Sequence, residues 1–265
     1  MRIRHTYAFE AYGVGIAVNT NRASIIDSVL RRLPAYFPTG YRKIEPARAE
    51  HSFTYEWRPT GFDHIHREGS PSISDLGRTA CLNLLCSYIR LKVAEYAPNH
   101  VFVHAGVVGW MDRAILIPGQ SFSGKTTLTA ELVRQGAEYF SDEYAILDTR
   151  GFVEPFPKTL SMRDRSDSTI QQEYNVEDFG GTIGKAHLPV GLVVITRFAE
   201  DATWSPQVLS RGTGVMEIIK NTVPARTSPD LVLRVLGMAL KSAKVIESLR
   251  SEAKHVANDI LRYLG

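Results

Sequence analysis

The sequence predicts an α/β protein with a smaller β-rich part at its N-terminus. Its 265 residues suffice for one large α/β domain, or for one domain with an appendage. An apolar run, a glycine turn and an amphipathic segment follow one another at 114–136, in the order strand, turn, helix. Residues 1–60 are aromatic and rich in strand formers. We therefore expect a β-rich N-terminal region at 1–72, packed on a core domain at 73–265.

Periodicity and turn formers locate the elements of the N-terminal region. The expected order is a strand at 7–18, a helix at 23–33, a strand at 52–57 and a turn-rich loop at 59–72. Asp75 is a candidate cap for a long helix over 76–96, which ends before Pro98.

The second region alternates apolar runs with amphipathic segments. Its expected strands cover residues 101–103, 107–110, 114–118, 137–140, 144–148 and 192–196. Its expected helices cover residues 127–136, 215–220 and 231–264. The segment 150–190 is polar and rich in turn formers, which is typical of an active-site loop or lid.

Composition limits the class of partner and the compartment. The chain is 44% hydrophobic and 22% charged, with a net charge of +3, so no nucleic-acid or anionic-membrane partner is expected. No apolar run approaches the length of a membrane span, and the N-terminus lacks the pattern of a signal peptide. Cys81 and Cys86 are expected to be buried thiols. These features favour a cytoplasmic protein.

The most specific motif is GQSFSGKTT at residues 119–127, which fits the phosphate-binding P-loop. Two glycines allow backbone angles and close approaches that a Cβ forbids, and backbone N–H groups at the helix start bind anions. The lysine is a point charge for the outer phosphates, and the first threonine is a ligand for the accompanying Mg²⁺. The expected nucleotide-binding residues are Gly119, Gln120, Ser121, Phe122, Ser123, Gly124, Lys125, Thr126 and Thr127.

An acidic pair, Asp142-Glu143, follows the next expected strand. Two carboxylates beside Mg²⁺ suit phosphoryl transfer to a hydroxyl, because one can hold the metal while the other accepts the hydroxyl proton. A solvated turn is the alternative for this pair. Asp148, at the end of another apolar run, is a rival metal-binding acid, but we expect it at the far end of its strand.

The run from Val103 to Asp148 resembles the catalytic core of the HPr kinase/phosphorylase family and its HPr-kinase-related members. The resemblance rests on His104-Ala105, a second strand, GQSFSGKTT, Arg134-Gln135-Gly136 and Ser141-Asp142-Glu143, in that order. It covers about fifty residues closely. It implies a mixed twisted sheet similar to that of phosphoenolpyruvate carboxykinase, and it implies a tendency to form homo-oligomers.

The resemblance also implies roles for single residues. Asp142 takes the position of the general base toward the acceptor hydroxyl, and Glu143, where the family usually has Asp, helps to hold the metal with Thr126 and Asp142. His104 takes the position of a histidine near the catalytic carboxylate, with a satisfied core histidine as the alternative. Arg211 corresponds loosely to an arginine that approaches the phosphates, with a surface arginine as the alternative.

One departure from the family lies at residues 161–164. The family's Glu-Ile-Arg-Gly signature supports metal binding and the reverse, phosphate-releasing reaction. Here the sequence is Ser161-Met162-Arg163-Asp164, which keeps only the arginine. Arg163 is therefore a candidate for stabilising the phosphoryl oxygens, while the reverse activity is in doubt.

We expect an ATP- and Mg²⁺-dependent kinase that acts on a hydroxyl. By resemblance, the acceptor is a serine of a peptide or small protein, and a small-molecule alcohol is the next choice. A regulatory module that binds nucleotide without transfer is the alternative from another class. A zinc site is not expected: His64-x-His66 beside Asp63 lacks further ligands at suitable spacing, so a polar loop is predicted there.

Overall fold

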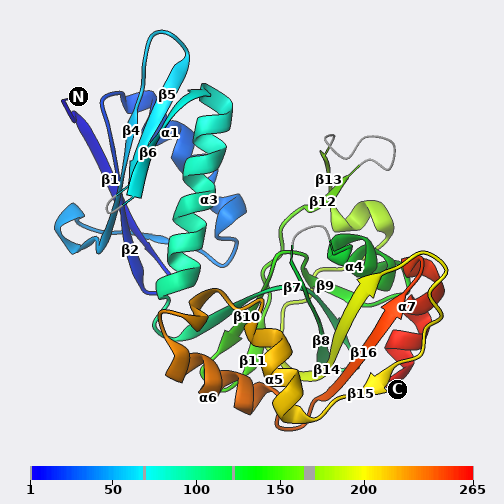
Figure 1. Ribbon diagram of the computed structural model, residues 1–265. Helices are drawn as coiled ribbons and strands as arrows, with labels where there is room; N and C mark the ends of the chain where they lie inside the picture. The colour runs from blue at the N-terminus through cyan, green and yellow to red at the C-terminus, as the bar shows by residue number, and fades with distance from the viewer. Residues whose placement is uncertain (1, 68–69, 121–122, 164–170, 265) are drawn as a thin grey trace. The chain divides into compact units, whose positions relative to one another are not determined.

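A computed structural model describes residues 2–67, 70–120, 123–163 and 171–264 (Figure 1). The chain divides into two compact units, Met1–Asn99 and His100–Gly265. Both contain a mixed sheet with helices, so the expected α/β class is confirmed. The expected boundary after residue 72 is too early, because the long helix α3 (Arg78–Tyr96) packs on strands β4, β5 and β6 and belongs to the first unit.

The first unit is built on a six-stranded sheet of order β3-β1-β2-β4-β5-β6. Its strands are β1 (His5–Ala11), β2 (Val14–Thr20), β3 (Arg42–Lys43), β4 (His51–Glu56), β5 (Phe62–Arg67) and β6 (Ser70–Gly77). The β2–β4 pair is parallel and the other pairs are antiparallel. Besides α3 the unit contains α1 (Ala23–Leu30), α2 (Leu33–Tyr36) and a 3-10 turn, η1 (Pro46–Arg48).

Two expectations for this unit are wrong. The single strand at 7–18 is a hairpin, because Tyr12 and Gly13 both have positive φ (50° and 81°) and reverse the chain. The loop at 59–72 is instead occupied mainly by β5 and the start of β6, and Asp75 lies in β6 rather than at a helix cap. Residues 62–67 form a strand because they pair with β4, although their turn-rich surroundings do not indicate one.

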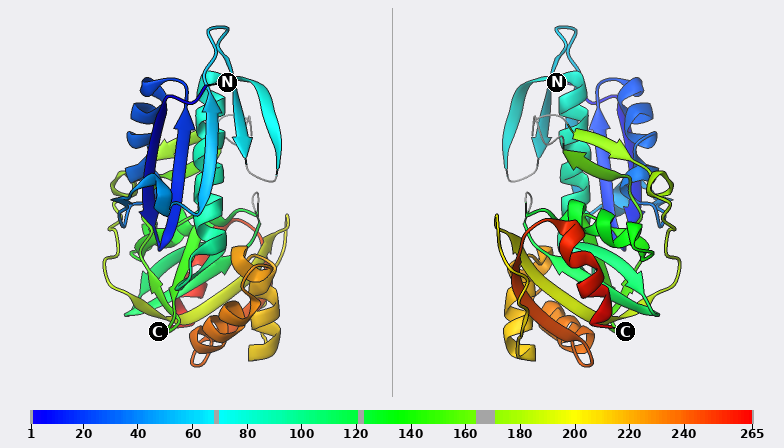
Figure 2. Two further views of the ribbon diagram at one scale, coloured as in Figure 1. Left: turned by 90° about the vertical axis from the view of Figure 1, so that its left-hand side faces the viewer. Right: turned by 90° about the vertical axis from the view of Figure 1, so that its right-hand side faces the viewer.

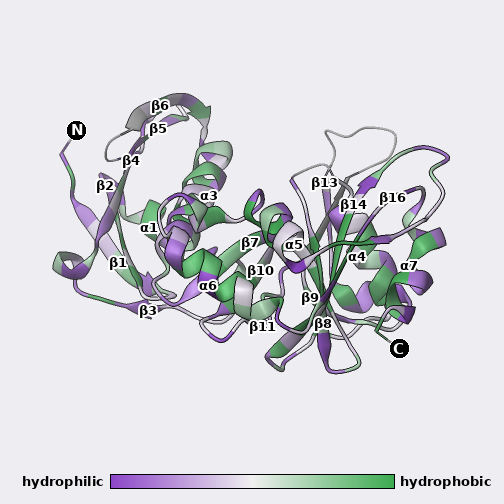
Figure 3. Cartoon of the chain, turned by 60° about the horizontal axis from the view of Figure 1, so that its bottom comes forward, coloured by the Kyte–Doolittle hydropathy of each residue, from purple (hydrophilic) through white to green (hydrophobic). Residues whose placement is uncertain are grey.

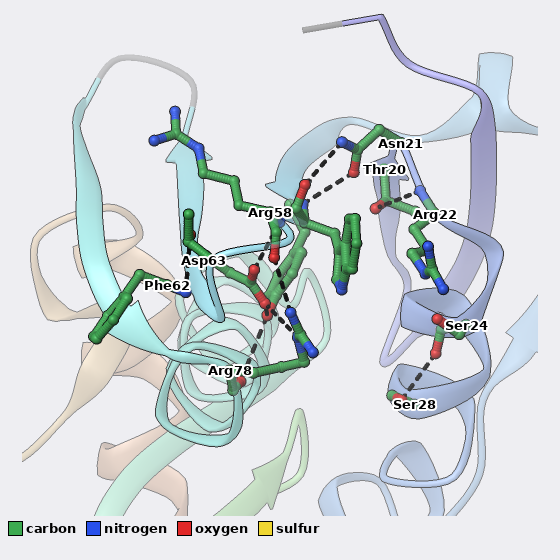
Figure 4. A network of polar contacts seen from close by, with 12 residues as sticks. Thr20, Asn21, Arg22, Ser24, Ser28, Arg58, Phe62, Asp63 and Arg78 are labelled. Carbon is green, nitrogen blue, oxygen red and sulfur yellow. Dashed lines mark hydrogen bonds and ion pairs between the residues drawn. The ribbon is translucent and has the colours of Figure 1, made fainter.

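A buried carboxylate joins β5 to the start of α3 (Figure 4). Asp63 is fully buried and accepts hydrogen bonds from Tyr55 Oη at 2.6 Å, Arg78 Nε at 3.0 Å and the backbone N of Arg58 at 2.8 Å. Burial and then the hydrogen bond to Asp63 raise the pKa of Tyr55, so its hydroxyl remains a donor. Asp63 therefore faces the helix side of the sheet and has a structural role.

The second unit is built on an eight-stranded sheet of order β11-β10-β7-β8-β14-β16-β15, with β9 paired to β7. Its strands are β7 (His100–Trp110), β8 (Arg113–Pro118), β9 (Glu138–Ser141), β10 (Tyr144–Asp148), β11 (Phe152–Glu154), β14 (Leu188–Phe198), β15 (Gln207–Val208) and β16 (Lys244–Arg250). A separate hairpin joins β12 (Leu160–Arg163) and β13 (Gln171–Tyr174). Strands β8, β14 and β16 are mutually parallel, so their carboxyl ends meet at one edge.

Helices cover both faces of this sheet (Figure 2). Helices α4 (Lys125–Arg134) and α7 (Ala253–Arg262) pack on one face, and α5 (Arg211–Ile219) and α6 (Pro229–Ala239) pack on the other. The 3-10 turns η2 (Val176–Phe179) and η3 (Val223–Ala225) complete the unit. Apolar residues follow the central strands, and most are fully buried (Figure 3).

Two expectations for this unit are also wrong. The strands at 101–103 and 107–110 are one continuous strand, β7, whose first half pairs with β10 and whose second half pairs with β9. The helix at 231–264 is α6, β16 and α7, because residues 244–250 pair with β14, and positions 246–250 alternate between buried and exposed as in a strand. Among the described residues, no helix is both long and apolar enough to cross a membrane.

Candidate functional site

The glycine turn at residues 119–124 joins β8 to α4 at the carboxyl edge of the parallel strands. Gly124 is the residue before the helix and has φ 79°. A Cβ there would lie 2.4 Å from Nη2 of Arg250, and a Cβ on Gly119 would lie 2.7 Å from Oγ of Ser123. Gly124 is therefore favoured by its backbone angle, and a Cβ at either position would displace the neighbouring side chain, Arg250 or Ser123. Ser121 and Phe122 lie outside the described residues.

The start of α4 directs hydrogen-bond donors toward the turn. Lys125, Thr126 and Thr127 form its first turn, where backbone N–H groups have no partner within the helix. Lys125 Nζ donates to the carbonyl of Gln120 at 2.6 Å. Burial lowers the pKa of Lys125, while the charges of Asp142 and Glu143 act in the opposite direction. The turn thus brings the positively charged side chain of Lys125 close to the N-terminus of α4, and both attract an anion.

Asp142 lies directly beside this turn. Its Oδ2 accepts a hydrogen bond from Thr126 Oγ1 at 3.1 Å, and its Oδ1 accepts one from Tyr139 Oη at 3.1 Å. The residue is only 9% exposed. Burial, followed by the charge of Asp142, raises the pKa of Tyr139, which keeps the phenol protonated as a donor. The juxtaposition of Asp142 and Thr126, expected from the sequence, is present.

The backbone around the acidic pair is fixed by a serine. Ser141 Oγ accepts hydrogen bonds from the backbone N of Glu143 at 3.1 Å and of Tyr144 at 3.0 Å. A hydroxyl that accepts two backbone N–H groups stabilises a tight turn between β9 and β10. The turn directs Asp142 toward α4.

The His104-Ala105 pair links the acidic turn to the glycine turn through its backbone. Ala105 N donates to the carbonyl of Glu143 at 3.2 Å, and the carbonyl of His104 accepts from Gly119 N at 3.1 Å. The His104 ring lies 4.8 Å from the ring of Tyr144, its direct partner across the strand pair. His104 is thus at the site, and its ring contacts the ring of Tyr144.

Glu143 points to a different partner from Asp142. Its Oε2 accepts from Lys158 Nζ at 2.9 Å, and both side chains are about four-fifths buried, with relative exposures of 19% and 20%. This ion pair occupies one of the two carboxylate oxygens of Glu143. Asp142 and Thr126 are the pair of oxygen donors that the structure brings together for a hard cation.

Arg211 is not part of this site, contrary to expectation. Its guanidinium donates to the carbonyl of Lys241 at 2.9 Å, just before β16 begins. The glycine turn contacts Arg250, at the other end of β16, and seven strand residues span about 20 Å. Arg211 instead begins α5 at an exposed position, which is the alternative of a surface arginine. Arg163 lies in β12, and its side chain is outside the described part of the chain.

Arg250 is a site residue that the sequence did not indicate. It is 3% exposed, and its Nη2 donates to the carbonyl of Gly124 at 3.0 Å while its Nη1 donates to the carbonyl of Ser251 at 3.1 Å. Burial lowers the pKa of this guanidinium. No local signal marks it, because the sequence of β16 does not alternate between apolar and polar residues: Ser248 and Arg250 are buried and Leu249 is exposed.

Three buried polar atoms at this edge have no hydrogen-bond partner among the described residues. They are Oγ of Ser123, Oγ1 of Thr196 and Nε of Arg250. Thr196 is near the end of β14, beside the ends of β8 and β16. Buried polar groups are nearly always paired, so these three atoms are candidates for hydrogen bonds to a bound polar ligand. Ligands of open α/β sheets bind outside the carboxyl ends of strands.

Asp148 lies at the opposite end of β10 from the acidic turn, paired with His100. Its carboxylate accepts from Arg150 at 2.8 Å and from the backbone N of Phe152 at 2.9 Å. These contacts give it a structural role in the turn before β11. The expectation that it lies at the far strand end is confirmed.

No protein-family model matches this sequence, and no protein of curated function matches it.

Proposed function

We propose that the second unit binds a nucleoside triphosphate, ATP, together with Mg²⁺ and transfers its terminal phosphoryl group to a hydroxyl. The observation that carries this proposal is the 3.1 Å contact between Thr126, in the first turn of α4, and the buried carboxylate of Asp142. It joins a candidate metal and phosphate site to a candidate base.

The phosphates fit the glycine turn. Its two glycines allow an approach that a Cβ would block, and α4 presents its N-terminus there. Lys125 supplies positive charge for the outer phosphates, and the guanidinium of Arg250 supplies a second positive charge next to Gly124. The Ser123 hydroxyl, which has no hydrogen-bond partner among the described residues, is a further donor on the same turn.

Mg²⁺ fits the oxygen donors on the opposite side of the turn. Thr126 Oγ1 and Asp142 Oδ2 are a hydroxyl and a carboxylate that already lie 3.1 Å apart. Hard cations of this kind prefer such ligands, and the bound ion would neutralise charge on the phosphoryl oxygens.

The proposed reaction forms a bond between the acceptor oxygen and the terminal phosphorus and breaks the bond from that phosphorus to the bridging oxygen. A nucleoside diphosphate leaves, and the acceptor proton passes to Asp142. Tyr139 and Thr126 hold the carboxylate in place, and its burial keeps competing water away. Lys158 neutralises Glu143 beside it.

The acceptor is proposed from the resemblance to HPr-kinase-related proteins: first a serine of a peptide or small protein, then a small-molecule alcohol. A module that binds nucleotide without transfer is a second candidate. The Glu143–Lys158 ion pair favours it, because this pair occupies the second carboxylate.

The test combines nucleotide binding with transfer of radiolabelled phosphate to serine peptides and to alcohols. We expect Asp142→Asn to retain ATP binding measured without Mg²⁺ and, with Mg²⁺ present, to transfer at least about a hundredfold more slowly. Lys125→Ala should weaken ATP binding itself. Asp259→Asn, at an exposed position on α7, is the matched control and should change neither.

Two outcomes would contradict the proposal in different ways. ATP binding without transfer to any acceptor, in the unmodified protein and the variants alike, would support the binding module. Absence of ATP binding in the unmodified protein would exclude both candidates.

A further inference from the structure

We propose that the first unit contains a site for a divalent transition-metal ion of the zinc type, formed by Glu56, His64 and His66. One ligand atom of each residue lies within 4.8 Å of the other two. This site is in a different unit from the proposed nucleotide site and does not depend on that proposal.

Strand pairing creates the cluster. Glu56 ends β4 directly opposite His64 on β5, and His66 is two residues further along the same strand. Residues at alternate positions share a face, so both histidines and Glu56 lie on one side of the sheet. Asp63 lies on the other side, bonded to Tyr55 and Arg78, and is not a ligand (Figure 4).

The distance between His66 Nε2 and Glu56 Oε2 fits two ligands of one metal ion better than it fits a hydrogen bond. His66 Nε2 and Glu56 Oε2 are 3.4 Å apart, which is long for a hydrogen bond. Ligands that bind tetrahedral zinc at about 2.0–2.1 Å are separated from one another by about 3.3–3.4 Å. His64 Nε2 is buried and has no hydrogen-bond partner among the described residues. Its lone pair is therefore available for a metal.

The other nitrogen of His66 is already fixed. Its Nδ1 lies 2.7 Å from Ser72 Oγ on β6. Metal-binding histidines usually use their second ring nitrogen in such a hydrogen bond, which sets the ring orientation and leaves the first nitrogen for the ion. Imidazole and carboxylate together suit zinc and its first-row neighbours.

A bulge in β6 brings a fourth potential ligand, the carboxylate of Asp75, to the cluster. Ile65 pairs with Ile73 and Asp63 with Leu76, so β6 has one extra residue there. Asp75 lies in this bulge with φ 62°, and its Oδ1 is 3.7 Å from His64 Nε2. Bulges and left-handed non-glycine residues often redirect a side chain at functional positions. Asp75 or water completes the coordination.

The test uses the full chain, stripped of metal by a chelator and free of nucleotide. Co²⁺ is titrated while its visible absorption is recorded, and Zn²⁺ is then added as a competitor. We expect one Co²⁺ per chain with the strong absorption of a four- or five-coordinate ion, displaced by Zn²⁺. His64→Ala, His66→Ala and Glu56→Gln should each abolish this signal or weaken binding at least about a hundredfold, and Ser72→Ala should weaken it about 10–100-fold.

His255→Ala, at an exposed position on α7, controls for loss of any histidine. This variant should bind Co²⁺ as the unmodified chain does. Protection of His64 and His66 from diethyl pyrocarbonate by Zn²⁺, measured by peptide mass spectrometry, tests the site in the unmodified chain if a variant misfolds. The proposal would be overturned if the unmodified chain did not bind Co²⁺, if Zn²⁺ did not protect the two histidines, or if His64→Ala and His66→Ala bound Co²⁺ as tightly as the unmodified chain. The cluster would then be an ion pair between His66 and Glu56.

Discussion

Replacement of the buried Arg250 by methionine separates a ligand-binding role from a structural one. Methionine keeps an unbranched apolar stem and removes the guanidinium. In the structure this group donates to the carbonyls of Gly124 and Ser251 and is 3% exposed. Burial lowers its pKa, so its charge is held in an unfavourable environment.

The expected effect on folding is small because two contributions oppose each other. Hydrogen bonds to a charged group contribute about 1.5–3 kcal/mol each, so the two bonds of Arg250 contribute about 3–6 kcal/mol. Desolvation of a buried ion costs several kcal/mol, and methionine avoids that cost. We therefore expect the free energy of unfolding of Arg250→Met to change by less than about 2 kcal/mol.

The expected effect on ATP binding is larger. A phosphate bound at the glycine turn would offset the desolvation of the guanidinium, and this benefit is lost in the variant. Loss of one charged interaction of about 1.5–3 kcal/mol corresponds to about 10–150-fold weaker binding. Calorimetric titration with Mg²⁺-ATP measures this, and denaturant unfolding measures stability. Arg262→Met, at an exposed position on α7, is the matched control.

Unchanged ATP affinity combined with a large loss of stability would refute the reasoning. Arg250 would then serve only to anchor the carbonyl of Gly124.

Three further predictions concern packing, ionisation and reactivity. Gly106→Ala should lower the free energy of unfolding by about 1–3 kcal/mol in urea, because its Cβ would lie 2.2 Å from Oγ1 of Thr129; unchanged stability would contradict that packing. Burial would raise the pKa of Asp148, but hydrogen bonds from Phe152 and Arg150 outweigh it and lower the pKa. The carboxylate therefore stabilises the fold fully above the ordinary Asp pKa of about 3.9, and this stabilisation is lost as pH falls through the lowered value. Asp148→Asn should thus be less stable than the unmodified chain at neutral pH, and the gap should close in acid; a constant gap would exclude the linkage. Burial raises the pKa of Cys86 to about 11, so only about one thiol in a thousand is ionised at pH 8 and iodoacetamide should alkylate it only on unfolding; fast labelling of the native chain would show that it is accessible.

The strand, glycine turn and helix at residues 113–134 could be predicted because their signals are local. Glycine before the helix, an apolar run before the turn and helical spacing after it each depend on neighbours in the chain. The position of Asp142 beside Thr126 could also be predicted, because only one helix and one strand separate these residues and consecutive elements usually lie next to each other.

The errors arose where a long-range pairing decides the structure. Residues 244–250 contain residues that also suit a helix, and only the neighbouring β14 makes them a strand. Arg211 was assigned by a loose resemblance alone, and its guanidinium bonds to the carbonyl of Lys241 instead. Residues 59–72 are rich in turn formers, yet part of this segment forms β5 because it pairs with β4. The same error hid the contact between Glu56 and His66.

By itself, the sequence determined the α/β class, the glycine turn and the acidic pair that follows it, because backbone angles and hydrophobic periodicity are set within a few residues. The tertiary structure alone decided that Arg250 reaches Gly124 over 126 positions of chain, and that a glutamate on β4 meets two histidines on β5. Such groupings depend on strand register, and a register shift of one residue would turn each side chain to the other face of its sheet.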